Sequence, residues 1–268
     1  MALLGWLAFL VVDHVAKGKP KPPPPPPVLR IIFPEGFTRR QMAERITAVD
    51  EIARETRAVD PKLSASVYLN ATRSSPLPGR FAGDWKRRNL EGFLFPAGYQ
   101  FRPWTRSGRL VREQLATFRE MWSKVNLRYA RSKNLTPYDV LIIASMIEKE
   151  VRAPEERRLV AAVIYNRLHD RMQLGIDATI RYGLHIPASE PITRAELATR
   201  NPYNTRLNRR LPPTPIANPG LPSMQAAAHP AKVNYLYFVR KPDKVHHFFT
   251  ATLRSFNAYQ RRHPLTSP

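Results

Sequence analysis

Two glutamates close an otherwise apolar stretch, residues 141–150, whose sequence is L-I-I-A-S-M-I-E-K-E. A carboxylate surrounded by aliphatic side chains is costly to ionise, so its pKa rises. A carboxyl group that is still protonated near neutral pH can donate a proton to a leaving group, which is general acid catalysis. Glu148 and Glu150 are therefore the first candidates for chemistry.

The element that positions them is predicted to be a helix. Thr136 is a suitable N-cap, Pro137 fits the first helical position, and Asp139 follows the cap by three residues. Nothing breaks the helix before Ala153 and Pro154.

At about 100° per residue, the two glutamates fall on opposite sides of an apolar stripe. Glu148 lies beside Leu141 and Ala144, whereas Glu150 lies on the side of Ile143 and Met146. The spacing leaves open which carboxyl group is the special one. It also leaves open that both are solvated or ion-paired at a helix end.

Composition restricts the possible partners. The 268 residues carry a net charge of +22 and no cysteine, which excludes disulfides, thiol nucleophiles and thiolate metal sites. Such a charge attracts polyanions: nucleic acid, an anionic membrane surface or an acidic cell-wall polymer. The basic residues are spread along the chain and no nucleic-acid-binding motif accompanies them, so a generally basic, solvated surface is the simpler interpretation. We expect no nucleic-acid partner.

The N-terminus predicts a tethered protein. Residues 1–12 form a nearly unbroken apolar run, and residues 19–27 read K-P-K-P-P-P-P-P-P, a stiff polyproline II spacer. The run is shorter than the roughly 20 residues that span a bilayer. It is either the last part of a transmembrane anchor or a buried terminal helix, and the spacer favours the anchor. We expect an anchor at 1–16 and a linker at 17–27.

The remaining segments predict an α+β fold. Strands are expected at 28–33 and 235–239, the latter with a hairpin partner at 246–250. Helices are expected from Thr38 to about Val49, within 107–134, and from Pro154. Residues 63–70 fit a short helix or strand, and residues 80–101 suggest extended structure that contains a polar residue, Glu91. Loops at 175–179, 201–205 and 211–222 carry Asn, Asp, Tyr and Thr side chains, more than plain connection requires.

The order and spacing of these segments resemble the YceG-like family, the MltG-type endolytic murein transglycosylases. The resemblance covers about residues 28–263. It is carried by E-G-F-L-F-P at Glu91, A-S-M-I-E-K-E at Ala144, Y-N-R-L at Tyr165, D-A-T-I-R-Y-G at Asp177, P-Y-N-T at Pro202, L-P-P-T-P-I-A-N-P-G at Leu211, A-A-A-H-P-A-K at Ala226, Y-L-Y-F-V at Tyr235 and a histidine-aromatic strand at His247. No one motif is diagnostic, but together they are specific.

The resemblance implies a function and a site. The family cuts nascent peptidoglycan strands between N-acetylmuramic acid and N-acetylglucosamine and leaves 1,6-anhydro ends, using the second glutamate of E-K-E, here Glu150, and no metal or cofactor. Glu148 would support the site. The residues that would position sugars are Asn166, Asp177, Tyr203, Asn204, Thr205 and Asn218. The implied location is the outer face of the cytoplasmic membrane, with a single-pass N-terminal anchor and peptidoglycan synthases as further partners.

The resemblance also implies domains: a small, partial LysM-like β-α subdomain at 28–75, then a mixed catalytic domain at 76–268 with a helix-borne glutamate and a loop-rich, β-containing C-terminal part. This chain departs from the family's pattern in places. The spacer stands where a first LysM-like stretch is usual, and Gly175-Ile176, Ala97-Gly98 and Thr252 replace commoner residues. A glycan-binding scaffold without activity and a basic polyanion-binding protein remain the alternatives.

Overall fold

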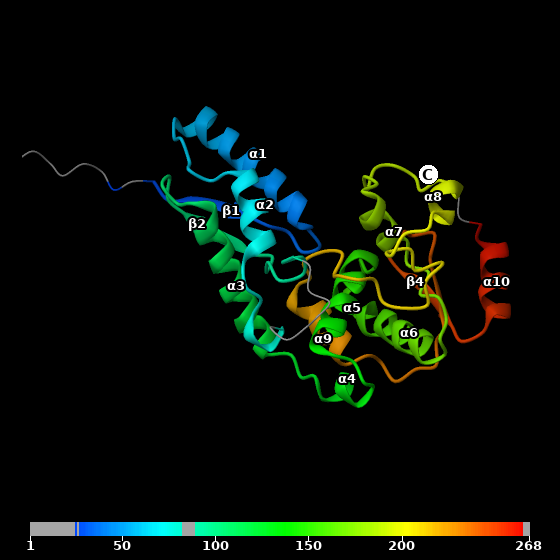
Figure 1. Cartoon of the computed structure of the whole chain (residues 1–268). Coiled ribbons are helices and arrows are strands. Elements are labelled where there is room, and N and C mark those ends of the chain that lie inside the picture. Colours follow the sequence, from blue (N-terminus) through cyan, green and yellow to red (C-terminus); the bar gives the residue numbers. More distant parts are fainter. Residues whose placement is uncertain (1–24, 26, 82–88, 265–268) are drawn as a thin grey trace, which may run out of the picture.

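The computed structural model describes residues 25, 27–81 and 89–264 (Figure 1). The expected anchor at 1–16 and most of the expected linker lie outside the described residues. Helices and two small sheets make up the described chain, which confirms a mixed α+β fold. None of the described helices combines the length and the apolar character that crossing a membrane requires.

The first sheet joins two distant segments. Strand β1 (Leu29–Ile32) pairs antiparallel with β2 (Gly98–Phe101), in a register that sets Leu29 opposite Phe101. Leu29 and Ile31 are buried while Ile32 is half exposed, the alternation of a strand with one covered face. Segment 28–75 therefore completes its sheet with residues beyond Ser75.

Two helices lie between these strands in the chain. Helix α1 (Arg39–Arg57) begins after Thr38, as expected, with a capping box of Thr38 and Gln41, but it continues past Val49 to Arg57. Of residues 63–70, expected as a helix or a strand, those from Ala65 on belong to helix α2 (Ala65–Ser74), whose N-cap is Ser64. In Figure 1, α1, α2, α3 and the β1–β2 sheet form one end of the molecule.

The prediction of extended structure over 80–101 is right only for β2. After the short 3-10 turn η1 (Gly79–Phe81), the E-G-F-L-F-P segment folds into turns, with Phe93 and Leu94 fully buried. Gly92 has φ +89°, and a Cβ there would stand 2.6 Å from Pro215 Cγ. Gly92 and Pro215 are 123 positions apart in the chain, so the local sequence pattern could not predict their close approach.

The middle of the molecule is helical. Residues 107–134 form two helices, α3 (Ser107–Ser123) and α4 (Arg128–Ser132), because the chain turns after Lys124. Helix α5 (Pro137–Glu150) has the predicted Thr136–Asp139 capping box and ends at Glu150. The 3-10 turn η2 (Pro154–Glu156), α6 (Arg157–His169) and α9 (Leu221–Ala228) follow, and α9 packs along α5.

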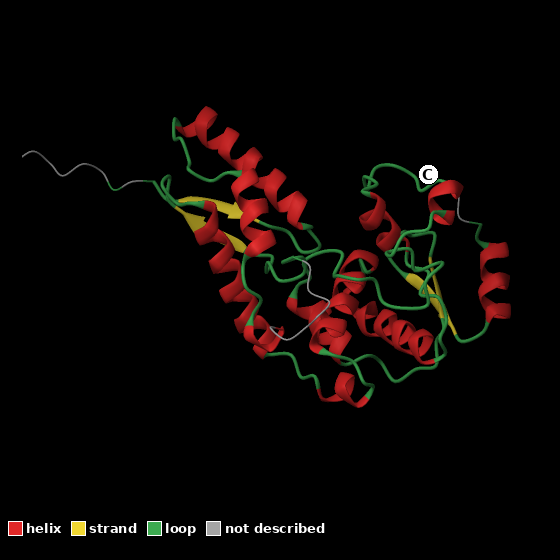
Figure 2. Ribbon diagram, in the orientation of Figure 1, coloured by secondary structure: helices red, strands yellow, loops and turns green. Residues whose placement is uncertain are grey.

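The C-terminal part is the end opposite β1 and β2 in Figures 1 and 2. It contains α7 (Asp177–Leu184), α8 (Arg194–Ala198), β3 (Tyr237–Arg240), β4 (His247–Thr250) and α10 (Leu253–Arg262). Strands β3 and β4 form the predicted antiparallel hairpin. Residues 177–179, expected in a loop, instead open helix α7.

Candidate active site

Glu150, the last residue of α5, faces the start of α7. Burial raises its pKa to about 7, and the negative charge of Asp177 adds to this effect. Arg240, the backbone amide of Ala178 and Arg206 act in the opposite direction. A large fraction of the Glu150 carboxyl groups is therefore protonated near neutral pH, and the carboxylate form would meet positive groups. Such a group can give a proton and take one back.

The P-Y-N-T loop fixes α7 against Glu150. The Thr205 Oγ1 lies 2.9 Å from Thr179 Oγ1 and accepts the backbone N–H of Ile176 at 3.0 Å. Arg206 Nε donates to Asp177 Oδ1 at 2.7 Å, which keeps this carboxylate beside Glu150. The loop thus sets both the position of α7 and the charges at its first turn.

Glu148 has a different environment. Its Oε2 accepts the backbone N–H of Gly220 at 3.0 Å, just before α9. Glu35 packs against the same Gly220, and partial burial followed by the charge of Glu148 raises the pKa of the Glu35 carboxyl. Lys149 Nζ donates to Gly36 O at 3.3 Å. Glu148 therefore joins the end of α5 to Gly220, and Lys149 joins it to Gly36.

Glu91, which the sequence marks only as a polar residue in an apolar segment, is a second buried carboxyl group. It is 2% exposed, and burial raises its pKa to about 7 although hydrogen bonds oppose the change. Its Oε1 accepts the backbone N–H of Arg39 at 3.0 Å and Asn218 Nδ2 at 2.9 Å, and its Oε2 accepts the Tyr182 hydroxyl at 3.1 Å. The sequence could have indicated this burial, because Glu91 lies between the apolar residues Leu90 and Phe93, which are both buried.

Asn218, predicted to position a sugar, has no exposed surface. Its Oδ1 accepts the backbone N–H groups of Gly92 and Leu94 at 2.9 and 3.0 Å. Its Nδ2 donates to Glu91 and to Phe37 O, both at 2.9 Å. The oxygen and the nitrogen of this amide are both hydrogen-bonded inside the protein. In this conformation Asn218 therefore holds loops together and offers no surface to a ligand.

The other predicted sugar-positioning residues divide into two groups. Asn204 and Thr205 are fully buried, and Asn204 Nδ2 donates to the carbonyls of Leu197 and Thr199. Asn166 is partly buried, and its Nδ2 donates to the carbonyls of Val233 and Tyr235 at 3.0 and 2.9 Å, which holds the approach to β3.

Asp177 and Tyr203 keep part of their surface accessible. The side chain of Asp177 is 46% exposed. The hydroxyl of Tyr203 lies 2.9 Å from Thr214 Oγ1, and its ring lies 5.1 Å from that of Tyr182. Asp177 acts directly on Glu150, and Tyr203 belongs to the loop at 201–205 whose Thr205 is bonded to α7.

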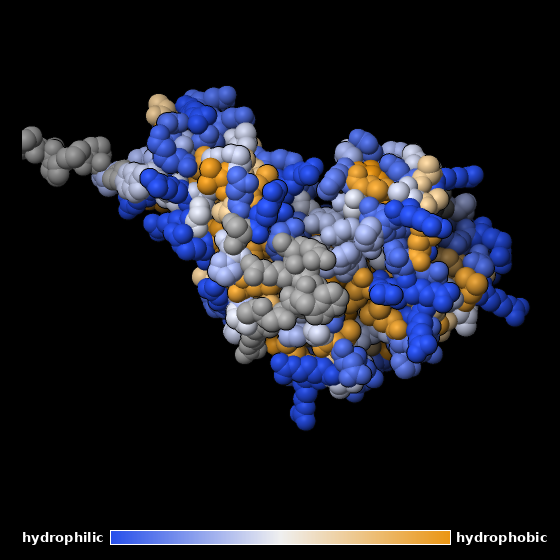
Figure 3. Space-filling view, viewed as in Figure 1, coloured by the Kyte–Doolittle hydropathy of each residue, from blue (hydrophilic) through white to orange (hydrophobic). Residues whose placement is uncertain are grey.

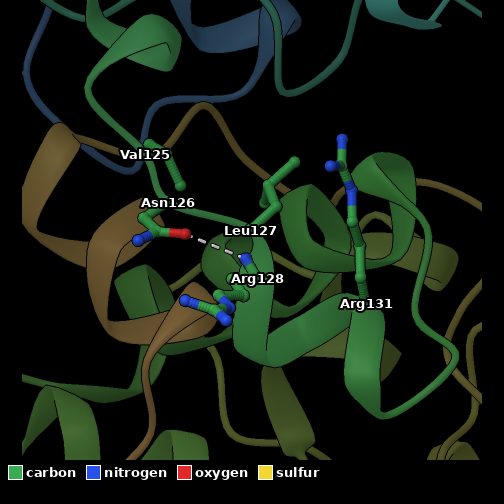
Figure 4. A pocket seen from close by; sticks show the side chains of 5 residues that line it. All are labelled: Val125, Asn126, Leu127, Arg128 and Arg131. Carbon is green, nitrogen blue, oxygen red and sulfur yellow. Dashed lines mark hydrogen bonds between the residues drawn. The ribbon is translucent and has the colours of Figure 1, made fainter.

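A basic hollow lies elsewhere, at the junction of α3, α4, α6 and α9. One part has a volume of about 300 Å³ and is lined by Val125, Asn126, Leu127, Arg128 and Arg131 (Figure 4). The adjoining part, about 530 Å³, is lined by Lys124, Asn126, Pro154, Arg157, Arg158, Pro222, Gln225, Ala226 and His229. The lining has five cations and no carboxylate. On the face seen in Figure 3, hydrophilic residues dominate the outer edges, with apolar residues in smaller patches.

The part of the chain that the structure describes contains no cluster of three or more His, Asp or Glu side chains arranged to hold a metal ion. Fold and site together define an α+β protein with a helix-borne carboxyl group whose pKa suits acid–base chemistry. The model of the YceG-like family matches residues 10–262, and the chain belongs to this family.

Similar proteins agree with this assignment. The chain is 32% identical over 241 residues to the endolytic murein transglycosylase of Bacillus subtilis (strain 168), covering 87% of this chain and 65% of that protein. It is 31% identical over 245 residues to the endolytic murein transglycosylase of Streptococcus pneumoniae (strain ATCC BAA-255 / R6), covering 85% of this chain and 43% of that protein. The chain thus spans about two-thirds or less of these relatives.

A solved structure has the same fold. The crystal structure of a yceG-like protein from Listeria monocytogenes superposes with a TM-score of 0.69 at 28% sequence identity, covering 86% of this chain and 75% of that one. The resemblance to the family found in the sequence is confirmed.

Proposed function

We propose that this protein is an endolytic lytic transglycosylase that cuts peptidoglycan strands, with Glu150 as the acid and then the base. The observation that supports this proposal most directly is the placement of Glu150, whose pKa of about 7 results from burial at the end of α5 beside Asp177. The names of the relatives from B. subtilis and S. pneumoniae indicate the substrate class.

The proposed reaction needs a single carboxyl group. Protonated Glu150 gives its proton to the glycosidic oxygen as the bond from C1 of N-acetylmuramic acid breaks. The resulting carboxylate takes the proton of that sugar's C6 hydroxyl, whose oxygen attacks C1 and closes a 1,6-anhydro ring. Glu150 ends protonated and no water is consumed. Arg240, Arg206 and the amide of Ala178 would stabilise the carboxylate between the two steps.

The residues around Glu150 would share the work of binding. Asp177 and Tyr203 have accessible surface for direct contacts with sugars. Asn204, Thr205 and Asn218 would act by holding the loops in place, and Asn166 by holding the approach to β3. Glu148 would support the site through its bond to Gly220.

We further propose that the body is tethered by residues 1–16 and the polyproline spacer to the outer face of the cytoplasmic membrane, where it could meet nascent glycan and the peptidoglycan synthases. The order β1, α1, α2, β2, closed by antiparallel pairing, would form the LysM-like unit, ending at Phe101 rather than Ser75. Fractionation of native cells tests the tether: recovery of the full-length protein only in the soluble cytoplasmic fraction would contradict it.

Product analysis tests the activity. Purified peptidoglycan is digested with residues 28–268, and the fragments are analysed by mass spectrometry before and after borohydride reduction. We expect 1,6-anhydro-muramic ends, which borohydride leaves unchanged. Reducible muramic ends would indicate hydrolysis, and an absence of cleavage together with retained glycan binding would favour the non-catalytic scaffold.

The basic hollow favours a second candidate function, binding of an anionic polymer. Heparin can serve as the probe in a titration at several salt concentrations. Changing Arg128 and Arg131 together to Gln should weaken binding more than the same change at Arg209 and Arg210, which are exposed elsewhere. Equal losses from the two pairs would assign the binding to diffuse charge.

A further inference from the structure

Glu91 has no part in the proposed proton transfers, yet it binds three separate segments. Its two carboxyl oxygens accept the backbone N–H of Arg39 at the start of α1, Asn218 Nδ2 from the loop before α9, and the hydroxyl of Tyr182 in α7. These partners lie 52, 127 and 91 positions away in the chain. Burying a carboxyl group is costly, and these hydrogen bonds offset only part of the cost, so the position of Glu91 needs an explanation.

Tyr182 connects Glu91 to the helix that faces Glu150. Burial, then the nearby charge of Glu91, raises the pKa of the Tyr182 phenol, so the hydroxyl stays a donor. The ring of Tyr182 lies 5.1 Å from that of Tyr203, and the next residue, Gly183, is so close to the same loop that a Cβ there would meet Asn201 Oδ1 at 2.6 Å. The C-terminal end of α7 is therefore held both by Glu91 and by the loop at 201–205.

Helix α7 has only eight residues, so its two ends are close together. Tyr182 follows Asp177 by five residues, which is about 7.5 Å along the helix axis. Thr179, bonded to Thr205, lies between them and makes a natural pivot. A change at Tyr182 would therefore tilt the helix about Thr179 and displace Asp177 and Ala178, the two residues whose charge and amide act on Glu150.

We propose that Glu91 and Tyr182 are positioning residues for Glu150. Their hydrogen bond fixes the angle of α7 and thereby the positions of Asp177 and Ala178, which face the catalytic carboxyl group. This inference rests on the proposed function. Because misplacing reacting groups by about 1 Å can cost on the order of a hundredfold in rate, a tilt of α7 should reduce turnover more than substrate affinity. No contact between Glu91 or Tyr182 and substrate is required.

Other charged groups close to Glu91 must be kept constant in a test. Arg39 lowers the pKa of Glu91, while Glu91 itself acts on Lys149 and on the buried phenol of Tyr68. The test therefore changes Tyr182 first, because Tyr182→Phe removes a hydroxyl group and leaves every charge in place.

The first measurement does not depend on activity. Selective ¹³C labelling of glutamate carboxyl groups allows Glu150 to be titrated by NMR in the folded wild-type protein and in Tyr182→Phe, with Glu150→Gln to assign the signal. Burial is the largest cause of the raised pKa, and a loosened α7 admits water, so we expect the pKa of Glu150 to fall in Tyr182→Phe. Tyr259→Phe, which removes the hydroxyl of a tyrosine that stacks on Phe248 in the C-terminal part, is the matched control and should leave it unchanged.

The second measurement is turnover on a defined glycan oligomer. We expect Tyr182→Phe to lower kcat about tenfold with KM within about twofold. We expect Glu91→Gln to do the same, because the amide NH2 that replaces one carboxyl oxygen cannot accept the hydrogen bonds that Arg39, Asn218 and Tyr182 donate to Glu91. The double variant Tyr182→Phe/Glu91→Gln should be no worse than the poorer single variant, because both changes act on one bond.

The outcomes separate the two proposals. If the wild-type protein forms no anhydro ends, the proposed function fails, while the NMR titration still tests the contact. If the wild type is active but folded Tyr182→Phe keeps both its turnover and the pKa of Glu150, the positioning role is wrong. Fully additive losses in the double variant would also contradict it.

Discussion

Glu148 and Glu150 are two residues apart on α5 but face different parts of the molecule. Glu148 Oε2 accepts the backbone N–H of Gly220 at 3.0 Å, next to Glu35, whereas Glu150 lies among Asp177, Ala178 and Arg240. Two positions on a helix are about 200° apart, so this divergence follows from helix geometry. The spacing of the two glutamates in the sequence left open which one is special; in the structure, Glu150 is the one that faces α7.

The first prediction concerns the identity of the acid. Glu150→Gln keeps the shape of the side chain and removes its exchangeable carboxyl proton, so turnover should fall at least about a hundredfold while the fold remains. Initial rates on purified peptidoglycan, with circular dichroism to check folding, measure this. Glu120→Gln, on the exposed face of α3, removes the same charge and should retain normal turnover. A folded Glu150→Gln protein with near-normal turnover would remove Glu150 from the mechanism.

The helix that carries Glu150 was readable from the sequence because its signals are local. The Thr136–Asp139 capping box and the apolar run occur within one short segment, and the structure has both the cap and the helix. The hairpin of β3 and β4 was predicted for the same reason, since its strands are neighbours in the chain.

The contacts that build the site were not readable in this way. The bond from Asn218 to Glu91 joins residues 127 positions apart, and no period or cap points to it. The family motifs identified Asn218, Asn204 and Thr205 as members of the site but not as buried residues. Whether a motif residue contacts ligand or holds the backbone depends on tertiary packing, which is what the structure adds.

The second prediction concerns pH. Because protonated Glu150 starts the reaction, kcat/KM should fall as pH rises above about 7. Asp177 raises the pKa of Glu150, so Asp177→Asn should move this fall to lower pH. Arg240 lowers the pKa of Glu150, so Arg240→Gln should move it to higher pH. Rates measured from pH 5 to 9 in constant ionic strength test both shifts. Shifts in the same direction would mean that another group controls the alkaline limb.

The third prediction concerns stability. Asn218→Ala removes the partner of two backbone N–H groups and of Glu91 in a fully buried place. Leaving buried polar groups unpaired costs about 1–3 kcal/mol each, so we expect the free energy of unfolding to drop by at least about 3 kcal/mol. Urea denaturation measures the loss. Asn257→Ala, on an exposed turn of α10, is the control and should change stability by less than about 0.5 kcal/mol. A comparable small change at Asn218 would contradict the network described here.

The last prediction links Glu91 to the pH dependence of stability. The pKa of Glu91 is 4.5 in an unperturbed chain and about 7 in the folded protein, so between these values the folded state binds more protons than the unfolded state. Stability from this group is therefore fully present below about pH 4.5 and is lost as pH rises through 7. The difference between the two pKa values corresponds to about 3 kcal/mol.

Glu91→Gln cannot ionise, so its free energy of unfolding should fall less between pH 4.5 and 7.5 than that of the wild type, by up to about 3 kcal/mol. Glu150 also has a raised pKa, but it is present in both proteins and its contribution cancels in the comparison. Urea denaturation of both proteins at half-unit pH steps gives the two curves, and Glu120→Gln should run parallel to the wild type. A loss of stability from a weaker hydrogen bond in Glu91→Gln is the same at every pH, so it shifts that protein's curve without changing its slope. Parallel curves for wild type and Glu91→Gln would show that Glu91 ionises normally in the folded protein, and its bonds to Arg39 and Tyr182 would then be those of a carboxylate.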